Sequence, residues 1–187
     1  QTTVTCTASD TRGNQTQASF TVTITLSQTN GPPVLTLPAD ITAEATDSSG
    51  AVVNYSVSAT DPDGDPVTIV CTPSAGSTFP LGPTTVTCTA TATGGEDTGS
   101  FTVTVVDTTG PVFANVPADI TDSTTDPQGK VVTFVDPSAS DAVDGDRPVS
   151  CAPASGSTFP VGQTTVTCTA SDTRGNQTQA SFTVTIT

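Results

Sequence analysis

The sequence has no histidine, methionine or tryptophan, and only four of its 187 residues are basic. Without histidine there is no catalytic triad or histidine general base, and without any CxxC pair there is no ordinary zinc site. No stretch reaches the roughly 18 apolar residues of a membrane-spanning helix, and no glycine-rich phosphate loop is present. The carboxylates lie in predicted turns, with no pair in apolar surroundings, so we expect no enzyme activity.

The charge of the chain is one-sided. Eighteen acidic residues against four basic ones give a formal net charge of −14. Residues 26–107 hold nine of the acids and no base. Such a surface repels nucleic acid and anionic membranes, so neither is an expected partner, whereas it favours divalent cations.

Two internal repeats organise the chain. Residues 1–25, QTTVTCTASDTRGNQTQASFTVTIT, recur letter for letter as residues 163–187, at an offset of 162. A looser repeat has half this period, because residues 71–90 align without a gap with residues 151–170. One module is therefore about 80 residues long, and two different modules make one full period.

These repeats predict three parts. Residues 1–25 form the C-terminal half of a preceding module, residues 26–107 form module A, and residues 108–187 form module B. The half module cannot bury its own apolar residues, so we expect another chain segment to complete it. That segment would be a tandem continuation of the same polypeptide or part of a self-associating neighbour that adds strands in trans.

The fold class follows from strict alternation of apolar and polar residues, which is the period of β-strands. In residues 85–90 and 101–105, and in their copies in module B, every second side chain is apolar. Further strands are predicted around residues 41–45, 53–59 and 67–71, separated by Gly, Pro and Asp turns. We therefore predict an all-β protein of tandem immunoglobulin-like antiparallel β-sandwiches. The few aromatic residues, such as Phe79 and Phe101, are expected to fill the core.

The junctions between modules are short. TLSQTNGPPV (25–34) and VVDTTGPVF (105–113) pass through Gly-Pro without a flexible Gly/Ser run. Because proline fixes φ and restricts the residue before it, we expect neighbouring modules to be held stiffly.

The five cysteines follow the repeats. Cys71 is expected to pair with Cys88, and Cys151 with Cys168, each bridge enclosing 16 residues and contributing about 3 kcal/mol on the chain-entropy model. Cys6 is the copy of Cys168, so its disulfide partner is expected outside residues 1–187. Repeated cysteine pairs in small β modules indicate an oxidising, extracellular or cell-surface location.

One combined motif resembles a known family. The residues Cys151 to Ala170, then Asp172-Thr173-Arg174-Gly175-Asn176, then Ser181 to Ile186 are similar to the hyalin repeat (HYR) module. The segment G-P-V-F-A-N-V-P-A-D-I-T at 110–121 also resembles its opening, whereas residues 91–98 of module A replace the D-x-x-G-N turn. The resemblance implies an immunoglobulin-related extracellular module of adhesion and surface proteins, without catalytic activity.

Two acidic loops are candidate calcium sites, because closely spaced carboxylates are hard oxygen ligands. They lie at the same place in the two modules and consist of Asp61, Asp63 and Asp65 in module A and Asp141, Asp144 and Asp146 in module B. Asp107, at the junction between the modules, could contribute to a rigidifying ion. The alternative is an acidic β-turn, where Asp-Gly supplies positive φ and local hydrogen bonds.

Three triplets match the N-glycosylation sequon, at Asn14, Asn54 and Asn176. Such triplets are frequent by chance in a threonine-rich chain.

Taken together, the sequence predicts a structural, non-catalytic segment of an extracellular filament, stalk or adhesin shaft. The alternative hypothesis is a calcium-dependent or carbohydrate-binding cell-adhesion module.

Overall fold

A computed structural model describes residues 1–25 and 29–187. Within these ranges the chain forms strands, turns and loops, and none of it forms a helix that could span a membrane. The chain divides into two compact units, Gln1–Gly31 and Pro32–Thr187. The first contains β1 (Thr2–Ser9) and β2 (Gln15–Val22), one antiparallel hairpin. The junction predicted at 25–34 lies partly outside the described residues.

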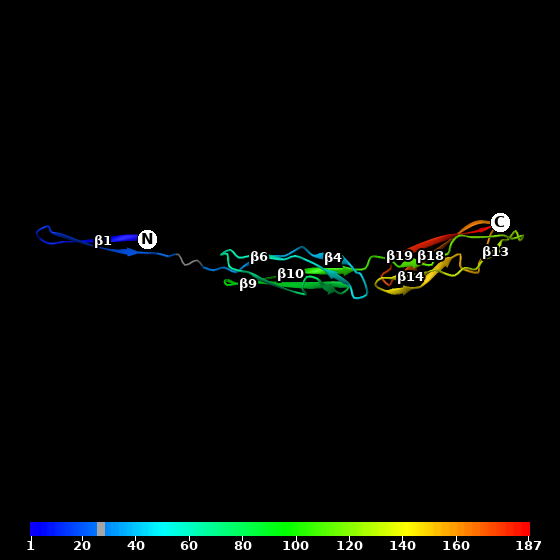
Figure 1. Ribbon diagram of the computed structural model, residues 1–187, viewed down its shortest axis with the longest axis horizontal. Helices are drawn as coiled ribbons and strands as arrows, with labels where there is room; N and C mark the ends of the chain where they lie inside the picture. Colours follow the sequence, from blue (N-terminus) through cyan, green and yellow to red (C-terminus); the bar gives the residue numbers. More distant parts are fainter. Residues whose placement is uncertain (26–28) are drawn as a thin grey trace. The chain divides into compact units, whose positions relative to one another are not determined.

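The described residues of module A form eight strands in two layers, whose course can be followed in Figure 1. One layer is a four-stranded sheet of order β4-β10-β9-β7, and the other consists of the pairs β3–β6 and β5–β8. The strands are β3 (Val34–Thr36), β4 (Ile41–Glu44), β5 (Ala51–Val53), β6 (Ser58–Thr60), β7 (Thr68–Thr72), β8 (Ser77–Phe79), β9 (Gly82–Ala92) and β10 (Gly95–Val106).

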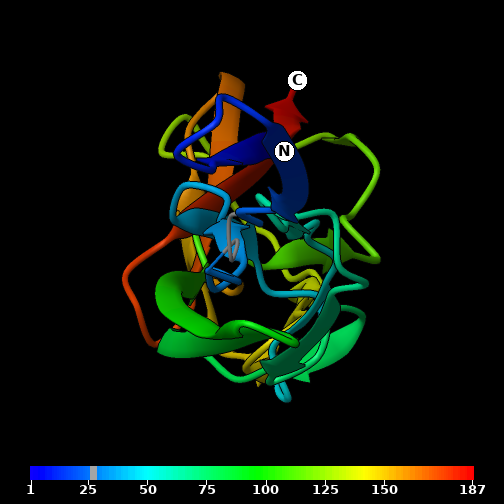
Figure 2. The ribbon, with the colours of Figure 1, turned by 90° about the vertical axis from the view of Figure 1, so that its left-hand side faces the viewer.

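Module B repeats this plan, with a sheet of order β12-β19-β18-β16 facing β11-β14-β15 and β13-β17. Its long strands β18 and β19, orange to red, can be followed in two views (Figure 1 and Figure 2). The strands are β11 (Val112–Ala114), β12 (Ile120–Asp122), β13 (Lys130–Val131), β14 (Ser138–Asp141), β15 (Gly145–Arg147), β16 (Val149–Ala152), β17 (Thr158–Phe159), β18 (Gly162–Ser171) and β19 (Gln177–Ile186).

The predicted fold class is confirmed, with one refinement in each module. The pairs β4–β10 and β12–β19 are parallel, whereas every other strand pair in the described modules is antiparallel. The repeated PADIT segment supports the parallel pair. Asp40 accepts a hydrogen bond from the N–H of Thr102 at 2.7 Å, and Asp119 accepts one from Thr183 at 2.7 Å.

The segment predicted as one strand over 53–59 is divided between two pairs. Residues 51–53 form β5 and pair with β8, while residues 58–60 form β6 and pair with β3. The alternation of buried and exposed residues nevertheless continues through the break. A period of two therefore identified the inward face but not the point at which the ladder changes partner.

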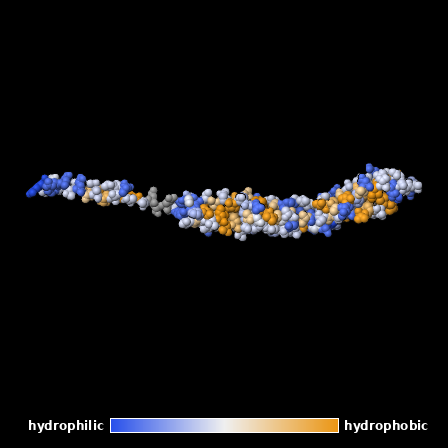
Figure 3. Space-filling model, in the orientation of Figure 1, coloured by the Kyte–Doolittle hydropathy of each residue, from blue (hydrophilic) through white to orange (hydrophobic). Residues whose placement is uncertain are grey.

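The core confirms the predicted inward positions. Val86, Cys88 and Val103 are fully buried, as are Val166, Cys168 and Val184. The predicted aromatic core positions are buried too, at Phe79, Phe101, Phe159 and Phe182. The face drawn in Figure 3 is mostly pale or hydrophilic, with hydrophobic residues in separate groups over the two modules. Threonine supplies many of the outward positions, as its preference for exposed strand faces predicts.

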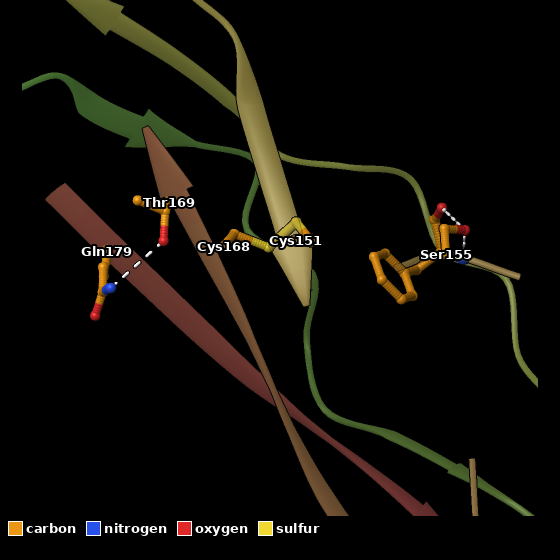
Figure 4. Close-up of a disulfide and its surroundings, with 6 residues drawn as sticks. Cys151, Ser155, Cys168, Thr169 and Gln179 are labelled. Carbon is orange, nitrogen blue, oxygen red and sulfur yellow. Dashed lines mark hydrogen bonds between the residues drawn. A yellow bond between two sulfur atoms is a disulfide. The ribbon is translucent and has the colours of Figure 1, made fainter. Parts of the chain in front are cut away.

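Each module carries one disulfide between neighbouring strands of its four-stranded sheet. Cys71 and Cys88 lie opposite each other on β7 and β9, and Cys151 and Cys168 lie opposite each other on β16 and β18 (Figure 4). Cys6 is a free, exposed thiol on β1.

Candidate functional site at the module junction

Three buried carboxylates meet where module A joins module B. Asp107 directly follows β10 of module A, Asp141 ends β14, and Asp172 directly follows β18. Their exposed fractions are 8%, 6% and 6%. One oxygen from each lies within 4.8 Å of the others. The strand ends of both modules therefore position one acidic cluster between them.

The Asp172 corner is shaped by the D-x-x-G-N turn between β18 and β19. The Oδ1 atom of Asp172 accepts the backbone N–H groups of Arg174 at 2.9 Å and Asn176 at 2.8 Å. The side-chain nitrogen of Asn176 donates to Asp172 Oδ2 at 2.6 Å. This self-closed turn presents the Arg174 and Asn176 side chains to the neighbouring module.

Both side chains of this turn bind module A. The Arg174 Nη1 atom lies 3.1 Å from Asp107 Oδ2 and 3.5 Å from Asp144 Oδ1. The Asn176 side-chain nitrogen donates to the backbone carbonyl of Asp107 at 3.0 Å. Thr173 anchors Asp144, donating to its Oδ2 atom from the backbone at 2.8 Å and from the hydroxyl at 2.7 Å. The Arg174 guanidinium of module B thus lies in a cluster that contains a module A carboxylate, and Arg147 of module B also attracts Asp144.

Apolar packing also crosses the junction. Val143 belongs to the β14–β15 loop of module B, yet it is 8% exposed and packs in the core cluster of module A. Gly110 lies so close to β19 that an added Cβ would meet the Thr178 hydroxyl at 2.7 Å and the Gln177 backbone at about 3.1 Å. The linker is therefore packed between the modules.

The linker is tied back to module A as well. Glu44, at the end of β4, accepts hydrogen bonds from the backbone N–H of Thr108 at 2.7 Å and from the hydroxyls of Thr108 and Thr109. These bonds hold the pKa of Glu44 below its ordinary value. With Pro111 fully buried, the short linker has few free dihedral angles.

The electrostatics of the cluster are unbalanced. Burial, and then repulsion from Asp141, raise the pKa of Asp107, and the attraction of Arg174 opposes this only in part. Burial also acts to raise the pKa of Asp172, but the hydrogen bonds from Asn176, Arg174 and Gly175 outweigh it and leave that pKa lowered. Hydrogen bonds from Thr173 lower the pKa of Asp144. The four carboxylates of the junction, Asp107, Asp141, Asp144 and Asp172, therefore outnumber the guanidinium groups of Arg174 and Arg147.

The remaining candidate metal residues lie elsewhere. In module A, Asp61 Oδ1 accepts the N–H groups of Asp63 at 2.9 Å and Asp65 at 3.3 Å, so the loop forms the predicted acidic turn. Asp61 Oδ2 is buried without a hydrogen-bond partner among the described residues. Asp146 is exposed on β15. Asp107, Asp141 and Asp172 form the one metal-competent group within the described ranges.

The sequons differ in their surroundings. Asn14 and Asn54 are exposed, and the Asn14 side-chain nitrogen donates to Asp10 Oδ2 at 2.7 Å. Asn176 is half-buried, and its side-chain nitrogen makes both of the hydrogen bonds described above. A sugar on that nitrogen would remove one of the two donors. Glycosylation at Asn14, Asn54 and Asn176 stays a prediction.

Comparison with known proteins identifies the modules. The HYR domain model matches twice, at residues 29–105 and 106–186.

The chain belongs to the HYR domain family.

Curated relatives agree with this assignment. The chain is 37% identical over 192 residues to "Hyalin" of Lytechinus variegatus and 35% identical over 192 residues to "Hyalin" of Strongylocentrotus purpuratus. Both matches cover 99% of the chain, which spans 36% and 16% of the two relatives' lengths.

Solved structures resemble these HYR modules more distantly. Titin domains z1z2 in complex with telethonin show 11% identity and a TM-score of 0.45, over 86% of this chain and 98% of that chain. The insect immune protein hemolin shows 16% identity and a TM-score of 0.40, over 99% of this chain and 56% of that chain. Human protocadherin-24 EC1-2 shows 18% identity and a TM-score of 0.38, over 84% and 98%.

Sequence reasoning missed two residues of the HYR junction. Asp172 and Arg174 lie in the D-x-x-G-N motif, which the sequence marked as a turn without a binding role. The difference between the two modules at this position could have indicated the role of the turn. Module A has Ala92 where module B has Asp172, so only module B has the motif. Asp107 and Asp141 were both among the residues considered for an ion.

Proposed function

We propose that this chain is a structural, non-catalytic segment of an extracellular filament, stalk or adhesin shaft. The observation that carries the proposal is the junction itself. Arg174 and Asn176 of module B bind Asp107, and Val143 of module B packs in the core of module A. Such contacts would hold successive modules in one orientation, as a stiff shaft requires.

Other features support the same function. Each module has its own disulfide, which suits an oxidising compartment. The relatives named hyalin are larger proteins, of which this chain spans 36% and 16%. Repeated modules are poor material for one active site but suit an array that grows by adding modules.

Electron microscopy of the native material tests the proposal. We expect long uniform threads whose axial repeat equals the length of two modules. Isolated short particles would instead make the chain part of a multidomain surface protein and would contradict the filament. A ligand screen would then follow.

A second function, calcium-dependent stiffening, is favoured by the three buried carboxylates at the junction. Carboxylate oxygens are the ligands that Ca²⁺ prefers. The carboxylates of the junction also outnumber the nearby guanidinium groups of Arg174 and Arg147. Asp107, Asp141 and Asp172 would supply the oxygens, and Arg174 would compete with the ion. A carbohydrate-binding function gains no such support, since every aromatic ring of modules A and B is buried or half-buried.

Calorimetric titration with Ca²⁺, and melting with Ca²⁺ or with chelator, test this second function. If it is correct, Ca²⁺ raises the melting temperature and Asp141→Asn abolishes both binding and the shift. Asp61→Asn is the matched control, because Asp61 occupies the equivalent loop outside the cluster, and it should leave both unchanged. Equal melting temperatures with Ca²⁺ and with chelator would contradict calcium binding at the junction.

A further inference from the structure

The hairpin of residues 1–25 has the fold of the β18–β19 hairpin but lacks its covering. Thr2 pairs with Val22 and Ser9 with Gln15, which is the register of Thr164 with Val184 and of Ser171 with Gln177 shifted by 162 residues. The turn is also reproduced. Asp10 accepts the same three hydrogen bonds, at 2.8, 2.9 and 2.7 Å, from the backbone of Arg12 and from the backbone and side chain of Asn14.

The inward face of this hairpin is exposed. Phe20 is 56% exposed and Val22 is 42% exposed, whereas their copies Phe182 and Val184 are 4% and 0% exposed. Val4 and Ile24 are also exposed, and their copies Val166 and Ile186 are buried. The face therefore has the chemistry of half a sandwich core, already in the correct register.

The cysteine identifies what covers this face. Cys6 is a free, exposed thiol, and its copy Cys168 is fully buried in a disulfide with Cys151. In Figure 4, Cys151 reaches Cys168 from β16. The covering surface of β18–β19 comes from residues 108–162, which supply β11 to β17 and Cys151.

We propose that the hairpin of residues 1–25 is completed by a polypeptide segment with the sequence of residues 108–162, joined in tandem to Gln1, and that Cys6 forms a disulfide with the Cys151 equivalent of that segment. This inference rests on the proposed tandem array. A second copy of the chain is not the occupant, because its own residues 108–162 are already covered by residues 163–187. Exchanging one identical hairpin for the other would bury one apolar face and expose another.

The proposal also explains the exposed turn of the hairpin. Arg12 and Asn14 are the copies of Arg174 and Asn176, which bind Asp107 of module A. Once completed, the N-terminal module would present the same junction to another type A module. The array would then have an ion-paired junction at every A-to-B step.

An extended chain tests the proposal, with residues 108–162 placed before Gln1 of the full chain. The readout is maleimide labelling of free thiols, with disulfides mapped by mass spectrometry. We expect one labelled thiol in the original chain, none in the extended chain, and a bridge from Cys6 to the added cysteine.

A second variant separates docking from disulfide formation. In the extended chain the added cysteine is replaced by serine, the equivalent of Cys151→Ser. Cys6 is then expected to stay reduced but to label at least about tenfold more slowly than in the original chain, until the protein is unfolded. Adding Phe20→Asp to this variant should restore fast labelling.

Three outcomes would overturn the proposal. They are unchanged labelling of Cys6 in the serine variant, a bridge from Cys6 to any other cysteine, and dimers of the original chain in which Cys6 is already protected. The last would identify a second copy as the occupant. Labelling of Cys6 tests this inference, and electron microscopy tests the filament. Threads in which Cys6 is accessible would refute this inference alone. A protected Cys6 without threads would refute the filament alone.

Discussion

Replacing Val143 with alanine should destabilise module A, although Val143 belongs to module B. The side chain is 8% exposed and packs in the module A core. The substitution removes two methyl-sized groups, each worth about 0.8 kcal/mol when buried, so module A should lose about 1.6 kcal/mol. For a module of this size, that loss lowers the unfolding midpoint by about 6 to 13 °C.

The chain offers a probe that reports on module A. Tyr55 is the one tyrosine, and there is no tryptophan. Its ring packs edge-on against Phe101 with centroids 5.0 Å apart, and its hydroxyl donates to the carbonyl of Pro73. Tyrosine fluorescence during heating therefore follows the unfolding of module A, while circular dichroism follows both modules.

Val132→Ala is the matched control for this experiment. Val132 is 6% exposed and lies in the core cluster of module B alone. It should lower the midpoint of module B and move the tyrosine signal much less than Val143→Ala does. An unchanged tyrosine midpoint in Val143→Ala, or an equal shift in both variants, would refute the reasoning that module B completes the core of module A.

Two further predictions concern the charges of the junction. Arg174→Gln removes the ion-pair partner of the buried Asp107 carboxylate. Because the arginine is itself partly exposed, the free energy of unfolding in urea should fall by only about 1 to 2 kcal/mol. Arg12→Gln, the same change in the copied turn, should leave the free energy of unfolding unchanged. A similar loss in both variants would contradict the ion pair. Asp107 has a raised pKa, so its charged form destabilises the fold above that pKa and the cost disappears as the pH falls through it. Asp144 and Asp172 have lowered pKa values, so their contribution is present above about pH 4 and is lost as the pH falls through the folded values. Asp107→Asn should therefore raise the urea midpoint at pH 7 and reduce its change between pH 7 and 4, and a lower midpoint at pH 7 would contradict this.

The strand pattern was readable from the sequence because burial in a sandwich has a period of two. Val86, Cys88 and Ala90 alternate with threonines, and all three are buried as predicted. The parallel pairing of β4 with β10 was not readable, because alternation gives a strand's face but not its partner. The division of residues 51–60 between two pairs was missed for the same reason.

The junction was only partly predictable. Asp107 and Asp141 were marked by their positions in acidic, turn-rich segments. Their meeting with Asp172, and the pairing of Arg174 with Asp107 across 67 residues, depends on how two folded modules dock. The local sequence does not encode that contact. The turn with Arg12 and Asn14 has the same sequence as the turn with Arg174 and Asn176, and neither sequence identifies the partner residue on another module. Module A has the acidic loop but lacks the D-x-x-G-N turn, and its Asp61 loop is not part of a carboxylate cluster within the described residues.

The distance between two spin labels placed across the junction tests the central claim most directly. Exposed Val52 of module A and exposed Val135 of module B would be replaced by labelled cysteines, with Cys6→Ser to avoid a third label. If the junction holds the modules as one stiff unit, pulsed electron resonance will give one narrow distance distribution that broadens with Arg174→Gln. A broad distribution with the junction residues intact would show that the modules move independently and would contradict the account.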